Sequence, residues 1–364
     1  MRVIHTESST GWGGQENRTL QEALQMRERG VDILLVCQPG SGLGQRGREH
    51  GIAVAEVRMK RSLSPTAIFA LAAEMRRFRP DIVNTHSGRD TLLAGLAARL
   101  LFSRSVPRPR VVRTRHLILP ITSRISYSGL PDHVVTVSRA VRENLIVAGV
   151  PAGMITAITT GVDCTRFDPE RAAPVLRKEL GISDGALLVG MVAILRFKKG
   201  HLDLLDAAAE VIKSLPDVRF VLAGNGPQHE NLQRAIAERS LQQQVRLLGL
   251  RRDIPDVLRS LDLFVLPTHQ EAFGTSFLEA QAMGVPVIGT DVGGVGEAVN
   301  QGVSGLLVPP HDPQALAAAI LALGHDPARR GAMSTAGRPW VLAEHSTGKM
   351  AERMLALYRE LLLE

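Results

Sequence analysis

The chain has few aromatic residues, few cysteines and no long apolar run. Aromatic residues make up only 4% of its 364 residues, and its two cysteines, Cys37 and Cys164, have no spacing that suits a disulfide framework or a metal site. We therefore expect two plain buried thiols. No apolar run approaches the roughly 18 residues of a membrane-spanning helix, and the segment from Met1 to His5 is typical of a buried first strand rather than a secretion signal. These absences favour a cytoplasmic protein.

Nucleic-acid binding is also disfavoured, although the net charge is +7. Residues 1–160 hold 22 Lys and Arg against 12 Asp and Glu, a balance of +10, whereas residues 161–364 hold 21 against 24, a balance of −3. The basic half has few aromatic side chains and no recognisable nucleic-acid module. Its charge therefore favours an anionic membrane face or ligand. A solvated arginine-rich surface is the alternative.

Strand-like and helix-like segments alternate along the chain. Short apolar runs rich in β-branched residues are separated by segments with helical periodicity, which predicts parallel sheets covered by helices on both faces. Open sheets of this kind bind ligands beyond the carboxyl ends of their strands, where the winding direction switches. The expected strands are 31–37, 81–85, 111–114, 133–137, 187–195, 218–223, 263–266 and 285–290, and the expected helices are 20–29, 67–78, 92–101, 202–215 and 232–239.

The length predicts two α/β domains with a cleft between them. The turn-rich segment 160–169 lies near the middle of the chain, and we place the junction there, with an N-terminal domain over 1–164 and a C-terminal domain over 165–345. A last helix over 346–364 is expected to begin after a break at Pro339 and Trp340. Its apolar face, with Met350, Met354 and Leu357, suits packing back on the first domain.

The stretch from Glu271 to Gly284 is the most informative part of the sequence. It follows an expected strand and predicts a loop and then a helix. Gly274 allows a ligand to approach the backbone, and the free N–H groups of Thr275 and Ser276 at the start of the helix suit a diphosphate. Glu279 lies one turn into that helix. Two carboxylates beside a phosphate site would repel the phosphate, so they make sense as acceptors for sugar and ribose hydroxyls.

Glu271 and Glu279, with seven residues between them, resemble the E-x7-E motif of the retaining glycosyltransferases of family 4, which have the GT-B fold. The resemblance covers about 180 residues of the second half and extends more loosely over the first half. It implies an α/β fold of two Rossmann-like domains facing each other across a cleft, with a C-terminal helix that crosses back to the N-terminal domain. The further segments that carry it are Lys199-Gly200, Gly224-Asn225-Gly226-Pro227, Leu248-Gly249, Gly284–Ile288, Gly293-Gly294, Glu297 and Gly305–Pro310.

The resemblance implies roles for particular residues. Glu271 would accept hydrogen bonds from the donor sugar and Glu279 from the ribose, while Lys199 would hold the diphosphate. The family places an arginine five residues before this lysine, where this chain has Ile194, and we expect Arg196 to supply that charge instead. Arg251 is expected near the base. The donor-binding set is completed by Gly224, Asn225, Gly226, Phe273, Gly274, Thr275, Ser276 and Leu278.

In the first half, the glycine cluster from Gly11 to Glu16 resembles the GG-x-E loop that lines the cleft in this family. Gly13 and Gly14 are therefore expected on the acceptor side, beside the donor phosphates. His116 occupies the place of a family histidine that faces the transferred sugar. His86 is more simply interpreted as a buried histidine, and Ser138 is expected to cap the following helix.

No DxD triplet occurs in the sequence, so we expect neither a metal nor another cofactor to hold the donor. The resemblance implies retention at the anomeric carbon, with the leaving phosphate accepting the acceptor's proton. Two alternatives stay open: a phosphorylase or sugar-phosphate synthase of the same architecture, and a non-catalytic nucleotide-binding subunit.

The acceptor is expected to be a glycan or lipid-linked molecule in lipopolysaccharide or cell-envelope synthesis. This hypothesis rests on a basic segment from Arg104 to Arg115 beside the apolar residues Leu100, Leu101 and Phe102, which suits peripheral contact with the anionic inner face of a membrane.

Overall fold

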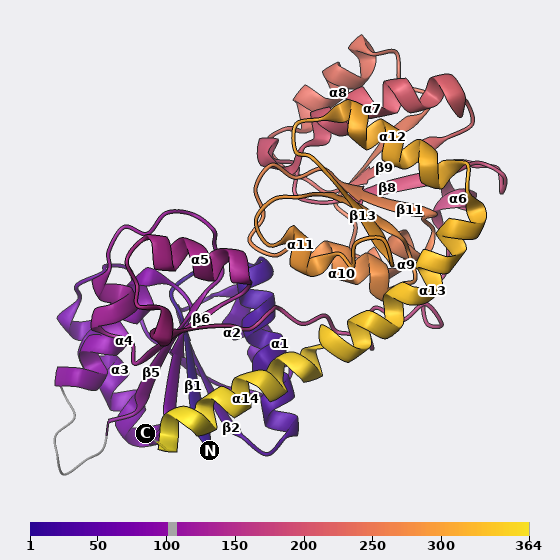
Figure 1. Cartoon of the computed structure of the whole chain (residues 1–364). Coiled ribbons are helices and arrows are strands. Elements are labelled where there is room, and N and C mark those ends of the chain that lie inside the picture. The colour runs from indigo at the N-terminus through magenta and orange to yellow at the C-terminus, as the bar shows by residue number, and fades with distance from the viewer. Residues whose placement is uncertain (101–107, 364) are drawn as a thin grey trace. The chain divides into compact units, whose positions relative to one another are not determined.

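The computed structural model describes residues 1–100 and 108–363. Arg104, Leu101 and Phe102 of the expected membrane segment lie outside these residues. The chain forms two compact units. Unit 1 comprises Met1–Gly161 and the C-terminal segment that begins at Thr347, and unit 2 comprises Val162–Ser346. Figure 1 shows a parallel sheet with flanking helices in each unit.

Unit 1 is built on a seven-stranded sheet in the order β3-β2-β1-β4-β5-β6-β7. All of its neighbouring strands are parallel. The winding direction switches between β1 and β4, so the loops that follow these two strands diverge at the carboxyl edge of the sheet. The strands are β1 Arg2–Glu7, β2 Asp32–Cys37, β3 Ala53–Glu56, β4 Ile82–Thr85, β5 Arg110–Arg115, β6 His133–Thr136 and β7 Ile155–Ala157.

Helices cover both faces of this sheet, and alternate residues of each strand feed two apolar cores. Val3, Leu35 and Val112 pack on one face with residues of α1 and α14, while Ile4 and Val36 pack on the other face with residues of α3 and α4. The helices are α1 Gly14–Glu28, α2 Gly42–Glu49, α3 Pro65–Phe78, α4 Gly88–Leu100, α5 Arg139–Val147 and α14 Thr347–Leu363, with short turns η1 Ile125–Gly129 and η2 Ala152–Met154.

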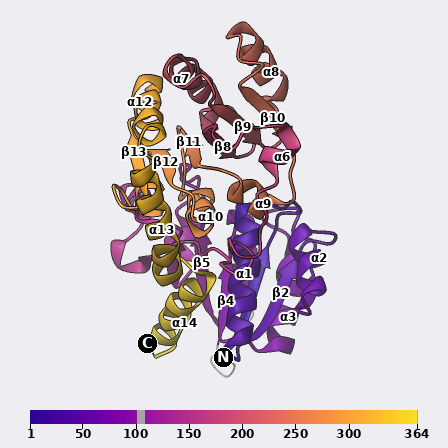
Figure 2. The same cartoon turned by 90° about the vertical axis from the view of Figure 1, so that its right-hand side faces the viewer.

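The C-terminal helix α14 packs beside α1, as expected for a helix that returns to the first domain. Its Tyr358 is fully buried, where its hydroxyl accepts a hydrogen bond from Asn84 at 2.9 Å and donates one to Glu22 at 3.3 Å. The two helices lie next to each other in Figure 2. Burial of the Tyr358 ring and these polar contacts fix α14 in one register on the sheet.

Unit 2 contains a six-stranded parallel sheet in the order β10-β9-β8-β11-β12-β13, with the switch between β8 and β11. The side chains of its central strand β11 are fully buried, which explains why Leu263–Leu266 is a continuous apolar run. The strands are β8 Leu188–Val192, β9 Arg219–Ala223, β10 Val245–Gly249, β11 Leu263–Leu266, β12 Val287–Thr290 and β13 Gly305–Val308. The helices are α6 Leu176–Leu180, η3 Phe197–Lys199, α7 His201–Ser214, α8 His229–Glu238, α9 Ile254–Arg259, α10 Thr275–Ala282, α11 Val295–Ala298, α12 Pro313–Gly324 and α13 Pro327–Glu344.

The loops at the carboxyl edge of this second sheet approach one another at backbone distance. A Cβ on Gly200 would lie 1.8 Å from the carbonyl oxygen of Pro267, and one on Gly224 would lie 1.9 Å from that of Ala193. A Cβ on Gly294 would lie 2.2 Å from the carbonyl oxygen of Ala272. Glycine is therefore the one residue type that fits at these three positions, which lie between loops rather than within a single turn.

The break expected at Pro339 is wrong. Pro339 lies inside α13, which continues to Glu344, and the chain leaves the helix at His345. Pro339 is exposed, so the carbonyl that loses its helical partner lies near solvent. The helix is also held by Arg338, which donates hydrogen bonds to the carbonyl oxygens of Phe167 and Ala282 at 2.8 and 2.9 Å.

Two smaller expectations concern cysteine and helix capping. Both cysteines are free, and Cys37 is buried as expected, whereas Cys164 is only half-buried. The Ser138 hydroxyl caps α5 by accepting a hydrogen bond from the backbone N–H of Val141 at 3.1 Å, which confirms the predicted cap. Within residues 1–100 and 108–363, no helix is long and apolar enough to cross a membrane.

The loop packing predicts that Gly200→Ala lowers stability more than Gly181→Ala. Both glycines have a left-handed backbone, with φ of 72° and 64°, but a Cβ on Gly181 would meet nothing within 4 Å. We expect Gly181→Ala to cost about 1–2 kcal/mol from backbone strain alone and Gly200→Ala to cost more, because a backbone carbonyl must also move. Urea denaturation of the two variants measures this. Equal losses would contradict the tight contact at Pro267.

Candidate active site

Unit 2 brings Lys199 and Glu271 together at the switch point of its sheet. Lys199 follows β8 in the short turn η3, Glu271 follows β11, and these two strands are neighbours. The ammonium of Lys199 forms an ion pair with a carboxylate oxygen of Glu271, and both side chains are less than a fifth exposed. The two residues that the sequence assigned to one site therefore lie in contact, although they are 72 positions apart.

The helix that follows Glu271 begins without a side-chain cap. Gly274 is the N-cap of α10, with φ of 95°, and no side chain accepts a hydrogen bond from the first turn. The same holds for α7, which begins after Gly200, and for α1, which begins after Gly13. By contrast, Ser or Asp side chains cap α2, α3, α5, α12 and α13. The open N-termini of α10 and α7 thus present N–H groups and a positive dipole end beside Lys199.

Glu279 lies one turn into α10 and is partly buried. Burial raises the pKa of its carboxyl group to about 7, against the opposite effect of the nearby Arg166. Only the ionised form accepts hydrogen bonds at both oxygens, so the capacity of Glu279 to accept them from a ligand changes close to neutral pH.

The loops after β8 and β9 bring three further predicted residues to the same edge. Gly224 donates its N–H to the carbonyl oxygen of Gly249 at 2.8 Å, and the N–H of Leu195 donates to the carbonyl oxygen of Asn225 at 3.0 Å. Gly226 leaves no room for a Cβ, which would lie 2.5 Å from the carbonyl oxygen of Leu195. Arg196 follows directly and is exposed, as is Ile194. The chain can therefore present a second positive charge from Arg196 where Ile194 offers none.

Three predicted donor residues are already engaged in the free protein. The guanidinium of Arg251 makes paired hydrogen bonds to Glu179 at 2.6 and 3.0 Å and to Asp253 at 2.9 and 2.7 Å, so two carboxylates neutralise it. The side chains of Phe273 and Leu278 are buried. Their predicted contact with a donor stays a prediction, but in this conformation it must come from their backbone.

In unit 1, the glycine loop between β1 and α1 is held at both ends by one carboxyl group. Glu7 accepts hydrogen bonds from the backbone N–H of Ser9 at 2.8 Å and from the side chain of Gln15 at 2.5 Å. Burial and the neighbouring Asp90 raise the pKa of Glu7 to about 8. A Cβ on Gly14 would meet nothing within 4 Å, and one on Gly13 would meet only Glu16, at 3.4 Å. The loop therefore leaves open space at the start of α1.

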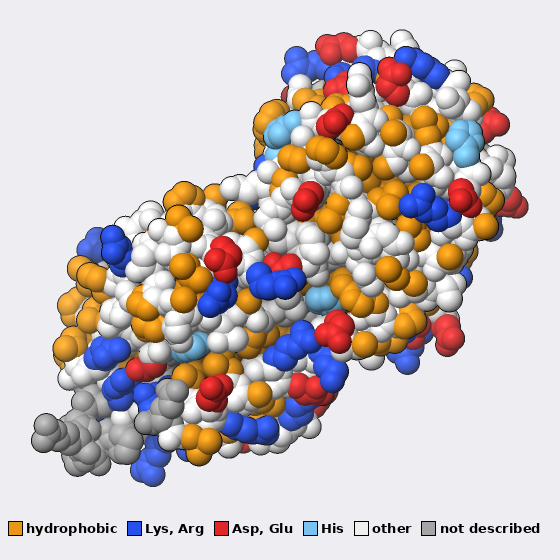
Figure 3. Space-filling view, in the orientation of Figure 1, with side chains coloured by type: hydrophobic (Ala, Val, Ile, Leu, Met, Phe, Trp, Pro, Cys, Tyr) orange, Lys and Arg blue, Asp and Glu red, His pale blue; other side chains and the backbone are white. Residues whose placement is uncertain are grey.

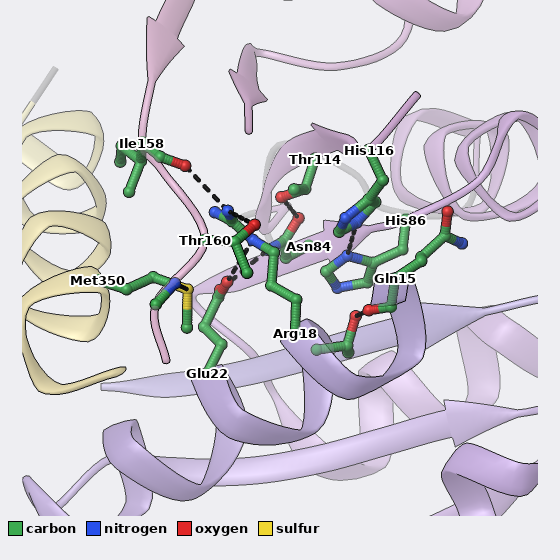
Figure 4. Close-up of polar contacts among 12 residues, drawn as sticks. Gln15, Arg18, Glu22, Asn84, His86, Thr114, His116, Ile158, Thr160 and Met350 are labelled. Atoms are coloured by element: carbon green, nitrogen blue, oxygen red, sulfur yellow. Dashed lines mark hydrogen bonds and ion pairs between the residues drawn. The ribbon is translucent and has the colours of Figure 1, made fainter. Parts of the chain in front are cut away.

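Three histidines form a hydrogen-bonded chain at the carboxyl edge of the unit 1 sheet. His5 lies on β1, while His86 and His116 follow β4 and β5 directly. Nδ1 of His5 is 3.1 Å from Nε2 of His86, and Nδ1 of His86 is 3.0 Å from Nε2 of His116. Figure 4 shows His86 and His116 pointing toward each other beside Asn84 and Thr114, whose side chains are joined by a hydrogen bond. The buried-histidine interpretation of His86 was incomplete, because its ring holds the predicted site residue His116.

The chain of three rings also fixes their protonation. Burial lowers the pKa of His5 to about 3 and the pKa values of His86 and His116 well below the ordinary range, so all three are neutral at pH 7. Nε2 of His5 is buried without a partner. A buried acceptor without a partner costs less free energy than a buried N–H donor without one, so we place no hydrogen on Nε2 of His5. Nδ1–H of His5 then donates to Nε2 of His86, and Nδ1–H of His86 donates to Nε2 of His116. His116 then carries its proton on Nδ1, the nitrogen outside the chain.

Sequence reasoning missed His5 and a buried ion pair behind the histidines. Arg18 on α1 donates hydrogen bonds to the carbonyl oxygen of Ile158 and the hydroxyl of Thr160, both at 2.9 Å, and lies 3.8 Å from Glu22. The available signal was helical spacing, because Arg18 and Glu22 are four residues apart and so share one face of α1, away from the face that carries Leu20 and Ala23.

The basic segment that motivated a membrane face is partly internal. Arg108 forms a paired ion bridge to Asp132 at 2.8 and 2.7 Å. Arg113 is buried, stacks 3.6 Å from the ring centroid of Tyr127, and donates to the Tyr127 hydroxyl at 2.9 Å. On the face drawn in Figure 3, Lys and Arg side chains are scattered among other types rather than gathered into one patch. These arginines stabilise the fold, so charge alone does not support the membrane hypothesis.

Family models match nearly the whole chain in two parts. Residues 12–166 match the model described as Glycosyltransferase Family 4, and residues 173–340 match the one described as Glycosyl transferases group 1. The chain belongs to this glycosyltransferase family. It is an enzyme of the GT-B type, as its two parallel-sheet units and the resemblance of its motifs led us to expect.

Characterised relatives and solved structures agree with this assignment. A D-inositol 3-phosphate glycosyltransferase of Corynebacterium urealyticum is 33% identical over 77% of this chain and 72% of its own length. A lipopolysaccharide core biosynthesis mannosyltransferase of Rhizobium meliloti is 32% identical, and the match spans 57% of this chain and 61% of the relative. The crystal structure of Anabaena HepE in complex with UDP has the same fold, with a TM-score of 0.87 at 22% identity over 99% of this chain and 100% of HepE.

Proposed function

We propose that this glycosyltransferase moves a hexose-type sugar from a nucleotide diphosphate donor, with retention and without a metal, to a glycan or lipid-linked acceptor in cell-envelope synthesis. The observation that carries the donor half of the proposal is the Lys199–Glu271 pair beside the uncapped N-terminus of α10. Positive charge, free backbone N–H groups and a carboxylate acceptor meet there at the switch point of a parallel sheet.

Each group has a distinct task in this proposal. Lys199 and the N–H groups of Thr275 and Ser276 hold the diphosphate and stabilise the charge that grows on it as the sugar leaves, with Arg196 as a second cation. Glu271 accepts hydrogen bonds from the sugar hydroxyls and Glu279 from the ribose. The diphosphate accepts the acceptor's proton. Metal independence rests on the absence of a DxD triplet and on this set of cations.

His116 contributes a directed hydrogen-bond donor. Its Nδ1–H is defined by the chain from His5 through His86, and all three rings stay neutral because they are buried. A neutral donor suits a sugar hydroxyl or ring oxygen, since an imidazolium would bind the phosphates instead. His86 thus acts as a positioning residue for His116.

The acceptor half of the proposal rests on an apolar surface next to His116. Leu117, Leu119 and Ile125 are 47%, 47% and 62% exposed on the segment that follows this histidine. Exposed apolar side chains so close together suit a lipid-linked acceptor or shallow contact with a membrane. The lipopolysaccharide mannosyltransferase of Rhizobium meliloti, one of the relatives, is consistent with a cell-envelope role.

A small phosphorylated acceptor is the second candidate. It is favoured by the likeness to the D-inositol 3-phosphate glycosyltransferase of Corynebacterium urealyticum and by the excess of positive charge in residues 1–160. It is related to an alternative that the sequence left open, a phosphorylase or sugar-phosphate synthase of the same architecture.

Thermal unfolding with nucleotides tests the donor site. With EDTA present, one of UDP, GDP, ADP, CDP and TDP should stabilise the protein, by about 2.7 kcal/mol at a concentration 100 times its Kd. Glu279→Ala and Lys199→Ala should each abolish the shift, because they remove the ribose acceptor and the phosphate cation. Lys198→Ala is the matched control and should retain it. A protein that no nucleotide stabilises would overturn the donor-site assignment.

The pKa of Glu279 predicts pH-dependent donor binding. Only the ionised carboxylate accepts two hydroxyl hydrogen bonds, so affinity for the donor sugar nucleotide should fall as the pH drops below about 7. Between about pH 8 and about pH 6 the loss should approach about tenfold. Calorimetry with the intact sugar nucleotide, a diester that does not titrate in this range, measures it. Glu279→Gln should give weaker and flat affinity, and a wild-type profile equally flat would exclude this role.

The acceptor proposal predicts binding to vesicles that contain anionic phospholipid at low salt. Leu117→Ser combined with Leu119→Ser should weaken this binding, because both substitutions remove apolar surface, whereas Leu342→Ser on α13 of unit 2, 43% exposed in the wild type, should not. Transfer assays then offer inositol 3-phosphate and glucose 6-phosphate as alternative acceptors. Turnover with either one, together with no preference for anionic vesicles, would replace the lipid-linked acceptor by the second candidate.

A further inference from the structure

Unit 2 contains a cluster of two histidines and one aspartate that the donor site does not use. Asp203 lies in the first turn of α7, His269 lies in the loop between β11 and α10, and His311 lies between β13 and α12. One ligand atom from each of the three, a carboxylate oxygen or a ring nitrogen, lies within 4.8 Å of the other two. Nε2 of His269 is 2.9 Å from a carboxylate oxygen of Asp203. The cluster lines a pocket of about 270 Å³.

The side chains are held as a ligand set would be. The ring of His269 packs against His311 with 3.9 Å between centroids and meets the edge of Phe197 at 5.7 Å. The backbone N–H of His269 donates to the carbonyl oxygen of Lys198 at 2.8 Å, and Thr268 donates to the same oxygen at 3.0 Å. His269 and Asp203 are 11% and 17% exposed, whereas His311 is on the surface. Two ligands are therefore fixed by polar contacts, and the third packs against His269 from the surface.

His311 carries a second, independent signal. Its φ is 57°, in the left-handed region that favours glycine, and it is one of three such non-glycine residues in the part of the chain that the structure describes. This conformation costs a side chain about 1–2 kcal/mol. A histidine at such a position retains strain that a glycine would relieve, and it turns its ring onto a second histidine. Strain of this kind collects at ligand-binding residues.

The donor set identifies the class of ligand. Imidazole nitrogen with one carboxylate suits Zn²⁺ and similar divalent transition metals, which take three protein ligands and a water in open tetrahedral sites. Bond lengths of about 2.0–2.2 Å place tetrahedral ligand atoms about 3.4 Å apart. The Asp203–His269 pair is already closer than this, and rotation of the exposed His311 side chain closes the remaining distance. A metal would replace the hydrogen bond between His269 and Asp203.

We propose that Asp203, His269 and His311 bind one divalent transition-metal ion, of which Zn²⁺ fits best. The site joins α7, the β11–α10 loop and the β13–α12 loop, and His269 is two positions from Glu271. Bound metal therefore stabilises the loop that carries Glu271, while Lys199, Glu271 and Glu279 hold no part of it. The metal would lie close to the donor site, because Arg196, the second cation proposed for the diphosphate, lines the same pocket as the cluster.

Cobalt substitution tests this site on the full-length, untagged chain after chelation and dialysis. Co²⁺ should bind at about one equivalent with the intense visible absorption of a tetrahedral site, and Zn²⁺ should displace it. Zn²⁺ should also raise the midpoint of thermal unfolding. Asp203→Asn, which keeps a hydrogen-bonding oxygen but loses the charge, should weaken Co²⁺ binding by at least about tenfold.

His311→Gly separates loss of the ligand from loss of the fold. It removes one ligand and relieves the left-handed strain, so the metal-free variant should unfold at a midpoint no lower than the wild type and gain nothing from Zn²⁺. His325→Ala, an exposed histidine of the same unit outside the cluster, should bind Co²⁺ like the wild type. The proposal is overturned if the wild type gives no tetrahedral absorption, if His311→Gly retains it with equal affinity, or if His325→Ala loses it.

Discussion

The donor half of the molecule depends on one steric constraint, the close approach of backbones at the carboxyl edge of its sheet. Gly200, Gly224 and Gly294 each contact a carbonyl oxygen of another loop so closely that a single added carbon would collide with it. These contacts join the loops after β8, β9, β11 and β12 into one layer. Lys199 is the neighbour of Gly200, and Glu271 lies four residues after Pro267, which Gly200 contacts. The packing of these loops therefore brings Lys199 and Glu271 together, and the ion pair follows from it.

The two units place helix N-termini and polar side chains where a stable fold does not need them. Ser or Asp side chains cap α2, α3, α5, α12 and α13, whereas α1, α7 and α10 begin at glycines and have no side-chain cap, a feature that they share with α11. Three neutral histidines stand in line at the edge of the unit 1 sheet where apolar side chains would fill the space. Features that reduce stability in this way are expected at functional sites. Here they coincide with the loops that sequence motifs had indicated.

The sequence predicted the interior of both sheets and missed their edges. The runs at 31–37, 81–85, 111–114 and 263–266 correspond to β2, β4, β5 and β11, whose side chains are buried almost throughout; β2 and β11 form continuous apolar runs, whereas β4 and β5 also contain buried polar residues. The four strands not expected are β3, β7, β10 and β13, and these are the outermost strands of the two sheets. These edge strands are three to five residues long and partly exposed, so they carry a weaker apolar signal than the buried strands between them. The helix break expected at Pro339 was wrong because a proline on the exposed side of a packed helix destabilises that helix too little to end it.

The same logic separates the site residues that sequence could find from those it could not. Glu271 and Glu279 belong to one strand-loop-helix segment, so their spacing alone places them in one site. Lys199 was assigned through its motif, and its contact with Glu271 depends on the order of β8 and β11, which no local pattern encodes. His5, His86 and His116 come from three strands, and their alignment follows from a register that pairs His5 of β1 with Asn84 of β4 and Asn84 with Val112 of β5. The contact between the rings of His311 and His269 depends on the left-handed backbone of His311, which the sequence does not predict.

The pairing of Lys199 with Glu271 resolves a difficulty that the sequence raised about two carboxylates beside a diphosphate. A free carboxylate at Glu271 would repel the phosphates, but in the folded protein its charge is already matched by Lys199. Glu279 meets the same difficulty by a different route, since burial raises its pKa to about 7 and reduces its average charge at neutral pH. Both carboxyl groups thus repel an arriving diphosphate less than two free carboxylates would. An arriving diphosphate finds a helix dipole and an exchangeable ammonium rather than two fixed anions, and its hydroxyl-bearing sugars supply the hydrogen bonds that make ionised carboxylates favourable again.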